Sequence, residues 1–381
     1  MKELIKRTIL HFLMTFFSVF KVKKSKLLFM SYYGGQYSCN PKYITEYLLK
    51  HDLHKKFEIV WVLNKPEQDR NKPFFRTAKA MSLRYFYHLA TAQVVITNHR
   101  LPNHFKKKDD QYYIQTWHSS LRLKQIEKDA GKALPDNYIE LAKHDSHMCN
   151  LLLSGCAKST EIFKRSFWYE GEILESGTPR NDILVSPQLD LVNRVKLKLN
   201  LSPEKKVVLF APTFRNKQKT TPLEFDVDRI LTTLKQAFGG EWVLLVKLHP
   251  HLTEMYRHTD FSKNVRNVTA YEDTQELLAC ADILITDYSS LMFDFAITER
   301  PCFLYTPDIE QYTASERKLY FQLSDLPFPS AVNEEALLVQ FDRFNKQDYL
   351  EKLATFLLAT GSFEEGKASE KVVERIHQIC S

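Results

Sequence analysis

Short apolar runs alternate along this chain with longer stretches in which apolar residues recur at helical spacing. The runs are rich in Val, Ile, Leu and Phe, which is typical of parallel strands buried on both faces. Strands are predicted at residues 27–30, 57–63, 94–96, 151–154, 173–174, 207–210, 243–246, 282–285 and 301–305, and helices at 41–51, 82–92, 157–167, 227–237, 274–279, 291–298 and within 333–381. A further strand is predicted within 112–120, where it runs into His118. The pattern therefore predicts an α/β fold built from strand–helix–strand units.

The clearest passage from a strand to a polar loop lies within residues 281–294. An apolar run is closed there by Asp287 and followed by Ser289 and Ser290, where the free backbone N–H groups of the next helix begin. Hydroxyl groups and a positive helix end together favour an anion, so this passage predicts a phosphate site. The alternative is that Asp287 and the serines only cap the helix.

Three more apolar runs end in polar loops of the same kind. The polar residues after these runs are Pro212, Thr213, Arg215, Lys247, His249 and His118. Because ligands of open α/β sheets bind at the carboxyl ends of the parallel strands, we expect these loops to converge on one cleft. Histidines and cationic residues in one cleft predict a phosphorylated ligand, although a histidine at a strand end can also be purely structural.

Five short motifs occur in a fixed order along the chain. They are Trp117-His-Ser-Ser120, Gly177-Thr-Pro-Arg-Asn-Asp182, Ala211-Pro-Thr-Phe-Arg215, Lys247-Leu-His-Pro250 and Thr286-Asp-Tyr-Ser-Ser290 with Asp294. This set resembles the motifs of the CDP-glycerol glycerophosphotransferases, the primases and polymerases of teichoic acid synthesis. The resemblance covers roughly residues 85–310. It implies a GT-B fold, that is, two Rossmann-like domains with the active site in the interdomain cleft.

The resemblance also implies an activity. The enzyme is expected to move glycerol phosphate from CDP-glycerol to a lipid-linked acceptor and to release CMP. The acceptor is expected to be an undecaprenyl-diphosphate-linked saccharide or a polyol-phosphate chain. The alternatives are a CDP-ribitol-dependent ribitolphosphotransferase, a GT-B sugar transferase or epimerase that uses a UDP-sugar, and a catalytically silent nucleotide-binding protein. The absence of a large extra domain favours a primase or short-chain transferase over a polymerase.

Residue roles follow from the same resemblance. It implies that His118 and His249 are the important histidines, with His118 as the general base and His249 on the donor phosphates, and these two roles can be exchanged. The predicted substrate-binding residues are Trp117, Ser119, Ser120, Arg180, Pro212, Thr213, Arg215, Lys247, Ser289, Ser290 and Asp294. The alternatives are a surface salt bridge for Arg180 and a helix-surface carboxylate for Asp294. No metal or other cofactor is predicted, because no Asp-x-Asp or His/Cys cluster demands a bound metal.

One residue departs from the family pattern. The family usually has glycine directly after the Trp-His pair, and Ser119 takes that position here. Glycine would permit a positive φ or a close approach of the backbone to phosphate. Ser119 therefore predicts a change in donor handling or acceptor choice, or an added hydrogen bond.

Length and composition fit two domains. The 381 residues, 44% of them hydrophobic, are enough for an N-terminal acceptor-side domain at 27–186 and a C-terminal CDP-donor domain with terminal helices at 205–381. The net charge of +7 suits an anionic substrate or surface, and no nucleic-acid-binding motif occurs, so no nucleic acid partner is expected. Six scattered cysteines without a CxxC pair indicate reduced thiols in a cytoplasmic chain.

The N-terminal residues 1–26 combine basic side chains with an apolar stretch at 9–20 that contains Phe12, Phe16, Phe17 and Phe20. This stretch is too short to span a bilayer core of roughly 30 Å. It predicts a helix in the membrane interface whose lysines face anionic headgroups, and hence a peripheral location on the cytoplasmic face of the cell membrane. The alternatives are an ordinary first helix docked on the domain and a signal peptide.

Overall fold

The computed structural model describes residues 2–381 apart from 67–74, 132–133, 187, 214–224, 249–262 and 316–317. The chain forms two compact units: Met1–Ser120 with Ile126–Asp182 and Phe363–Ser381, and Leu121–Gln125 with Ile183–Ser362. These units differ from the predicted domains 27–186 and 205–381, because residues 363–381 join the first unit and residues 121–125 join the second.

The first unit is built on a seven-stranded sheet in the order β3-β2-β1-β4-β5-β6-β7. All neighbouring strands are parallel. The strands are β1 (Lys23–Met30), β2 (Glu58–Leu63), β3 (Arg76–Lys79), β4 (Ala92–Thr97), β5 (Tyr112–Gln115), β6 (Leu151–Leu153) and β7 (Glu172–Leu174). The sequence did not predict β3, because this edge strand has only one buried residue, Ala78, and therefore carries no apolar run.

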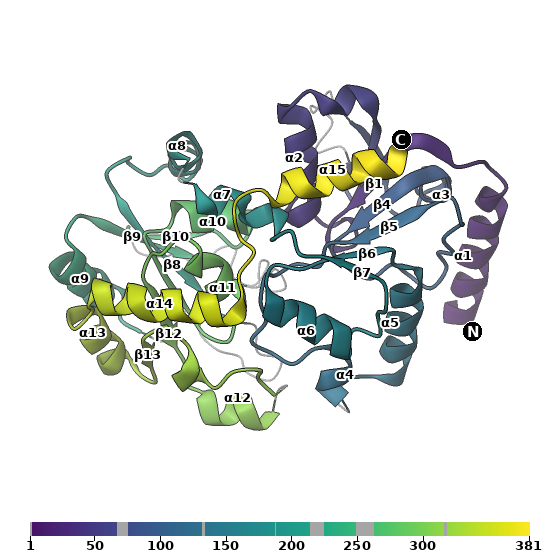
Figure 1. The fold of residues 1–381 in the computed structure, drawn as a ribbon. Helices are drawn as coiled ribbons and strands as arrows, with labels where there is room; N and C mark the ends of the chain where they lie inside the picture. The colour runs from purple at the N-terminus through teal and green to yellow at the C-terminus, as the bar shows by residue number, and fades with distance from the viewer. Residues whose placement is uncertain are drawn as a thin grey trace. The chain divides into compact units, whose positions relative to one another are not determined.

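Helices cover both faces of this sheet (Figure 1). Leu27 and Phe29 of β1 face a core that includes α2 (Cys39–Lys50) and α15 (Ala368–Cys380). Leu28 and Met30 face the other core, which includes α1 (Lys2–Ser18), α3 (Leu83–Thr91) and α5 (Asp136–Met148). The other helical segments of this unit are η1 (Tyr32–Gly34), η2 (Leu53–Lys56), α4 (Glu127–Ala130), α6 (Ala157–Ser166), η5 (Pro179–Asn181) and the start of α7 (Asp182–Val185).

The second unit is built on a six-stranded parallel sheet in the order β10-β9-β8-β11-β12-β13. The strands are β8 (Lys206–Ala211), β9 (Trp242–Val246), β10 (Val265–Asn267), β11 (Ile283–Thr286), β12 (Cys302–Tyr305) and β13 (Ser330–Ala331). The helical segments are α8 (Leu189–Lys198), α9 (Val227–Phe238), α10 (Thr274–Cys280), α11 (Leu291–Ala296), α12 (Ile309–Ser315), η7 (Leu323–Asp325), α13 (Glu334–Asp342) and α14 (Lys346–Thr360). The predicted α/β class with parallel sheets is confirmed.

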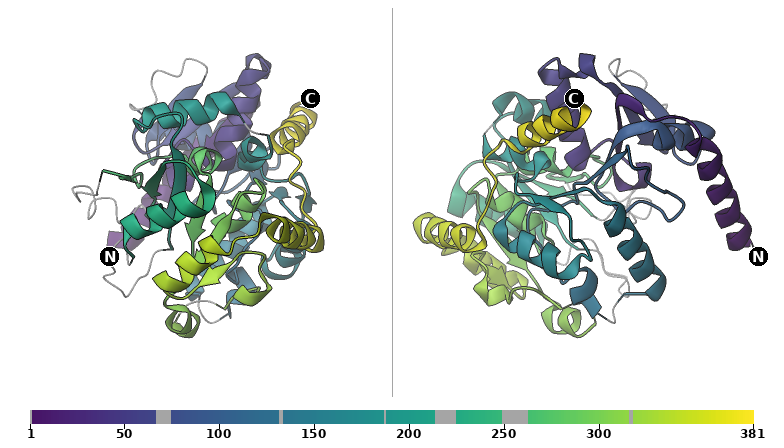
Figure 2. Two further views of the ribbon diagram at one scale, coloured as in Figure 1. Left: turned by 90° about the vertical axis from the view of Figure 1, so that its left-hand side faces the viewer. Right: turned by 45° about the vertical axis from the view of Figure 1, so that its right-hand side comes forward.

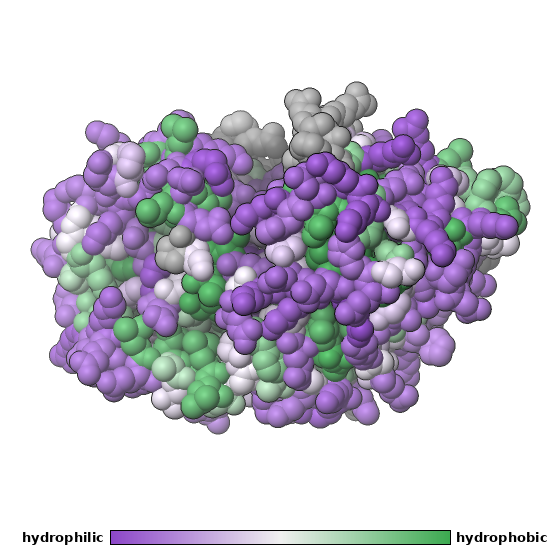
Figure 3. All heavy atoms as spheres, turned by 45° about the horizontal axis from the view of Figure 1, so that its top comes forward, coloured by the Kyte–Doolittle hydropathy of each residue, from purple (hydrophilic) through white to green (hydrophobic). Residues whose placement is uncertain are grey.

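Helix α1 has two different apolar faces. Met14 is buried against the core that includes α3, and Leu10, Leu13 and Phe17 pack beside it. The opposite face exposes large apolar side chains, which are Ile5, Ile9, Phe12 and Phe16, followed beyond the helix by Val19 and Phe20. Figure 2 shows α1 as an arm at the edge of the first unit, and apolar side chains lie over it at the right-hand edge of Figure 3.

One lysine of this region does not match its prediction. Lys26, expected among the headgroup-facing lysines, is fully buried in β1 and donates from Nζ to Thr91 Oγ1 at 2.6 Å. Burial lowers the pKa of Lys26 to about 8. Among the helices that the structure describes, none is long and apolar enough to cross a bilayer.

Candidate active site

His118 lies in the loop that follows β5 and is exposed to solvent. Its Nδ1 atom is 3.1 Å from the backbone oxygen of Asn98, at the end of the neighbouring strand β4. A carbonyl oxygen only accepts hydrogen bonds, so Nδ1 carries the proton and Nε2 is the basic nitrogen of the neutral ring. The ring also stacks on Trp117, with centroids 4.7 Å apart. This geometry suits a general base.

Asn40, in the first turn of α2, connects the His118 loop to the motif at 177–182. Its Nδ2 donates to the backbone oxygens of Thr116 and Trp117, each at 3.1 Å. Its Oδ1 accepts from the backbone N–H of Arg180 at 3.0 Å. Asn40 is fully buried, so these bonds are shielded from water. We did not predict this residue, and its only sequence signal is an Asn-Pro pair where a helix begins.

Arg180 is buried, with 7% of its surface exposed, and its Nη1 lies 3.6 Å from Cys39 Sγ. A surface salt bridge is therefore wrong for this residue. The same motif also attaches the C-terminal helix α15, because Asp182 accepts from the backbone N–H groups of Ala368 and Ser369 at 2.9 and 2.8 Å. Asp182 of this motif therefore anchors the start of α15 on the first unit. The phosphate role of Arg180 remains a prediction.

The serines after His118 differ in environment. Ser120 is buried, and its backbone oxygen accepts from Ser159 Oγ at 2.5 Å. Ser119, at the usual glycine position, is not among the residues with positive φ. The left-handed residue of this loop is Trp117, with φ of 51°. The serine at 119 therefore causes no backbone strain in this loop.

In the second unit, Asp287 organises the loop after β8. Its carboxylate accepts from the backbone N–H of Thr213 at 2.9 Å and from Thr213 Oγ1 at 2.6 Å. It also accepts from the backbone N–H of Tyr288 at 2.6 Å. The loops that follow β8 and β11 are therefore brought together, as predicted for neighbouring parallel strands. Pro212 directly precedes Thr213 in this loop.

The two serines before α11 accept backbone hydrogen bonds. Ser289 Oγ accepts from the N–H of Leu291 at 3.3 Å, whereas Ser290, the N-cap residue of α11, makes no side-chain capping bond. Ser290 Oγ accepts from the N–H of Leu123 at 3.3 Å. Leu123 belongs to the segment Leu121–Gln125 of this unit, and its own backbone oxygen accepts from Tyr320 at 2.7 Å. Phosphate binding by either serine remains a prediction.

Lys247 and Asp294 are the other predicted donor residues that the structure describes. Lys247 Nζ donates to the backbone oxygen of Thr269 at 3.0 Å and also to that of Tyr271. Burial lowers the pKa of Lys247 to about 8. Asp294 is fully buried in α11 and accepts from Gln275 Nε2 at 3.1 Å, so the helix-surface alternative is wrong. His249 and Arg215 lie outside the described residues.

The pKa of Lys247 gives a test of its predicted phosphate contact. The ammonium form is present below the pKa and is lost as pH rises through about 8. If Lys247 binds the donor phosphates, KM for the donor should rise between roughly pH 7 and 9. Lys247→Arg keeps its charge at these pH values and should show no such rise. The same steep rise in Lys247→Arg would contradict the role.

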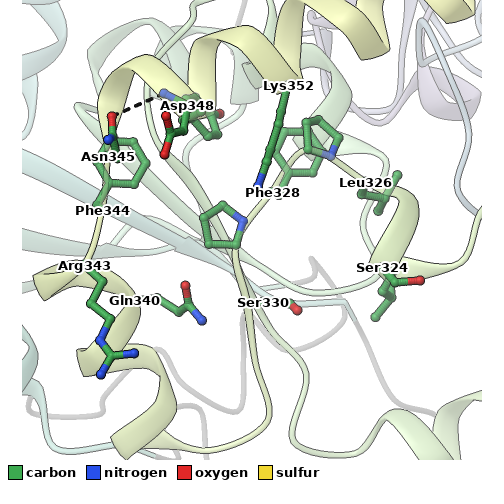
Figure 4. Close-up of a pocket in the computed structure, with 14 residues that line it drawn as sticks. Ser324, Leu326, Phe328, Ser330, Gln340, Arg343, Phe344, Asn345, Asp348 and Lys352 are labelled. Atoms are coloured by element: carbon green, nitrogen blue, oxygen red, sulfur yellow. Dashed lines mark hydrogen bonds between the residues drawn. The ribbon is translucent and has the colours of Figure 1, made fainter.

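A cavity of about 350 Å³ in the second unit lies apart from these residues (Figure 4). It is lined by Phe328 and other residues that precede β13, and by the ends of α13 and α14, including Arg343 and Lys352. The motif residues instead follow β8, β9 and β11. In a parallel sheet, residues that precede a strand and residues that follow a strand lie at opposite edges of the sheet. None of the predicted site residues that the structure describes lines this cavity.

Comparisons with known proteins agree on one family. Residues 11–378 match the family described as CDP-Glycerol:Poly(glycerophosphate) glycerophosphotransferase. The teichoic acid poly(glycerol phosphate) polymerase of Bacillus subtilis is 33% identical over 93% of this chain, but this chain covers 49% of its length. The teichoic acid glycerol-phosphate transferase of Staphylococcus aureus is 32% identical over 98% of this chain and 99% of its own length.

A solved structure supports the fold. The wall teichoic acid polymerase TagF has a TM-score of 0.84 with this chain at 30% identity, covering 100% of this chain and 98% of that one. The predicted GT-B-like architecture of two parallel α/β sheets is thereby confirmed. The chain spans about half the length of the first two polymerases it matches, with 49% and 51% covered. The motifs, the fold and the match over residues 11–378 together place this chain in the CDP-glycerol:poly(glycerophosphate) glycerophosphotransferase family.

Proposed function

We propose that this protein transfers glycerol phosphate from CDP-glycerol to a hydroxyl group of a lipid-linked acceptor and releases CMP, in the synthesis of teichoic acid or a related cell-surface polymer. The observation that carries this proposal is the family match over residues 11–378. The glycerol-phosphate transferase that aligns over nearly its whole length favours glycerol over ribitol as the transferred polyol. An acceptor that ends in a saccharide or in a polyol phosphate satisfies the same chemistry.

The reaction requires a base on the acceptor side. The acceptor oxygen attacks the β-phosphorus of CDP-glycerol, the bond from that phosphorus to the CMP oxygen breaks, and the acceptor proton moves to the base. His118 fits this role, because its ring is exposed and its Nδ1 proton is held by the backbone oxygen of Asn98, so the acceptor proton would go to Nε2. The Asn98 oxygen also stabilises the imidazolium that forms.

The donor side requires positive charge and N–H groups around the phosphates. We assign this role to Lys247, Thr213 and Arg180, together with Arg215 and His249. The Thr213 contact with Asp287 supports it, since a loop held by both the N–H and the hydroxyl of Thr213 on one carboxylate is preorganised for binding. Asp287 itself acts through Thr213 and serves as a positioning residue. Ser289, Ser290 and Asp294 complete the proposed donor set.

The test compares donors. Purified protein is incubated with CDP-glycerol, CDP-ribitol or a UDP-sugar, each with and without a lipid-linked acceptor, and nucleotide release is measured. Release of CMP from CDP-glycerol that depends on acceptor is the expected result. Faster turnover of CDP-ribitol would replace glycerol by ribitol, and nucleotide release from a UDP-sugar alone would identify a sugar transferase or epimerase. Binding of CDP-glycerol without release would leave a catalytically silent protein.

We also propose that the protein binds the membrane surface through the outer face of α1. Phe12 is 68% exposed and Phe16 is 53% exposed, although both are large apolar side chains. The next segment exposes Lys21 and Lys24, which suit anionic headgroups. Met14, on the inner face of the helix, is buried in the core of the first unit and so fixes the helix to that unit. The outer face therefore remains exposed to solvent. This arrangement is typical of peripheral interfacial binding.

Substitution of the two outer phenylalanines tests this proposal. Phe12→Ser with Phe16→Ser should weaken binding to vesicles of anionic phospholipid by roughly tenfold or more, because each exposed ring would otherwise be buried in the interface. Vesicle sedimentation measures the binding, and Leu358→Ser, in an exposed part of α14, is the matched control. High salt should release wild-type protein only in part, because screening weakens the lysine contribution alone. Complete release by salt would show that the phenylalanines do not insert.

A further inference from the structure

The turn after β1 has an unusual backbone. Tyr32, Tyr33 and Gly34 follow one another with φ of 45°, 56° and 83°. Non-glycine residues visit this left-handed region rarely, and then usually as single residues. The turn is closed by bonds from the N–H of Gly34 to Ser31 and from that of Gly35 to Tyr32, at 2.9 and 3.0 Å. Such strained segments concentrate at functional sites.

The turn rests on the residues that support His118. The N–H of Tyr32 donates to Asn98 Oδ1 at 2.9 Å, and the N–H of Tyr33 donates to His99 Nδ1 at 3.4 Å. The backbone oxygen of the same Asn98 accepts from His118. Residues 32–33, 98–99 and 118 all follow strands β1, β4 and β5, which are neighbours in the sheet. The tyrosines and His118 thus lie at the same edge of the first unit.

The two tyrosine rings are exposed, by 39% and 60%. Every other tyrosine that the structure describes is buried or half-buried. The ring of Tyr32 lies 6.3 Å from the ring of His118, and that of Tyr33 lies 4.1 Å from the ring of His99. Two adjacent exposed aromatic rings bury little apolar surface and therefore contribute little to the stability of the fold. A polar residue would suit both the solvent and the turn at these positions.

Within the part of the chain that the structure describes, the support under the turn also contains buried polar atoms without hydrogen-bond partners. Asn98 is fully buried and His99 is 5% exposed. Among the described residues, Asn98 Nδ2 and His99 Nε2 have no hydrogen-bond partner. His99 Nδ1 lies 3.4 Å from the N–H of Tyr33 and 3.2 Å from Asn98 Oδ1. Buried polar atoms without a hydrogen-bond partner are rare in folded proteins, and a role at a functional site is one explanation for them.

We infer that the Tyr32–Tyr33 turn binds the hydroxyl-bearing end of the acceptor and presents it to His118. The ring faces would cover the C–H groups of a polyol or sugar, and the phenol hydroxyls would donate to its oxygen atoms. The inference rests on the proposed function and adds an acceptor site to it. It makes Tyr32 and Tyr33 determinants of acceptor affinity, with no part in donor binding.

The test measures KM for acceptor and donor separately. Tyr33→Asn and Tyr32→Asn remove the ring but suit a left-handed φ, because asparagine tolerates that conformation. Each is expected to raise KM for the acceptor about tenfold and to leave KM for CDP-glycerol unchanged. Tyr33→Trp keeps an aromatic face and should retain the acceptor KM within about threefold. Leu358→Ala, which removes an exposed side chain of the second unit, is the matched control.

Two acceptor analogues are compared, one ending in a saccharide and one ending in glycerol phosphate. They show which of these two acceptor ends the tyrosines recognise. A raised KM for either analogue supports the site and identifies the end that it recognises. An unchanged acceptor KM in both asparagine variants, with normal wild-type turnover, would overturn the inference alone. Absence of any CMP release by wild-type protein would overturn the proposed function, and this inference with it. A variant with a lowered unfolding midpoint is replaced by Tyr33→Phe, which keeps the ring and removes the phenol oxygen. Tyr33→Phe must raise the acceptor KM relative to wild type if that oxygen contributes.

Discussion

His118→Ala is expected to lower the rate of CMP release by at least about a hundredfold, because removal of a general base costs on that order. The structure gives the physical reason, since Nδ1 is held by Asn98 at 3.1 Å and Nε2 is the basic nitrogen. The measurement is single-turnover release of CMP from CDP-glycerol in the presence of acceptor. Donor affinity, measured by calorimetry without acceptor, should change little if His118 acts on the acceptor.

A second histidine of the same unit serves as the control. His147 is exposed on α5, and His147→Ala should release CMP at the wild-type rate. Near-normal release by His118→Ala would remove this residue from the mechanism. Loss of donor affinity in His118→Ala would instead indicate that His118 contacts the donor phosphates and that His249 is the general base.

Arg100→Met is expected to destabilise the first unit by about 3–5 kcal/mol, because it leaves buried carboxylates without their partner. Arg100 is 2% exposed and pairs with Asp145 at 3.0 Å and with Glu127 at 3.1 Å, both also buried. Its guanidinium also lies 4.2 Å from the Phe167 ring centroid. The measurement is the midpoint of chemical or thermal unfolding, followed by a signal from the first unit.

A surface pair of the same unit provides the comparison. Arg165 pairs with Asp129 at 2.6 Å, but the arginine is 53% exposed. Arg165→Met should therefore cost at most about 1 kcal/mol. Equal midpoints for Arg100→Met and wild type would show that the buried cluster does not stabilise the fold. Because Arg100 lies 5.9 Å from the Trp117 ring, the same change should also disturb the loop that carries His118.

The sequence predicts the strands that carry long apolar runs, and these place the motif loops at the carboxyl ends of the two sheets. The structure confirms this arrangement for Thr213 and Asp287, which meet across neighbouring strands. Short edge strands are missed, because β3 and β10 contain few buried residues and so have no distinct pattern. The sequence pattern alone does not show that α15 packs on the first unit, because the contacts of Val372 and Ile376 with the first core are not local in sequence.

Side chains that bind distant backbone groups are equally hard to predict. Asn40 contacts residues 76 to 140 positions away, and Asn98 contacts Tyr32 from 66 positions away. Neither lies in one of the five motifs. Asn98 follows a predicted strand, but its place after the strand does not identify the residues it contacts. The burial of a single charged residue also cannot be read from the sequence. Surface positions for Arg180 and Asp294 are therefore compatible with the sequence, although both residues are buried in the structure.

The most direct test of the central claim follows the transferred group itself. Purified protein is given CDP-glycerol labelled in its glycerol and a lipid-linked acceptor, and both CMP and labelled lipid are measured. The proposed function predicts label in the lipid product in amounts equal to the CMP released, with the number of units per acceptor giving the product length. Release of CMP with no label in the lipid, or lipid modification that depends on a UDP-sugar, would contradict it.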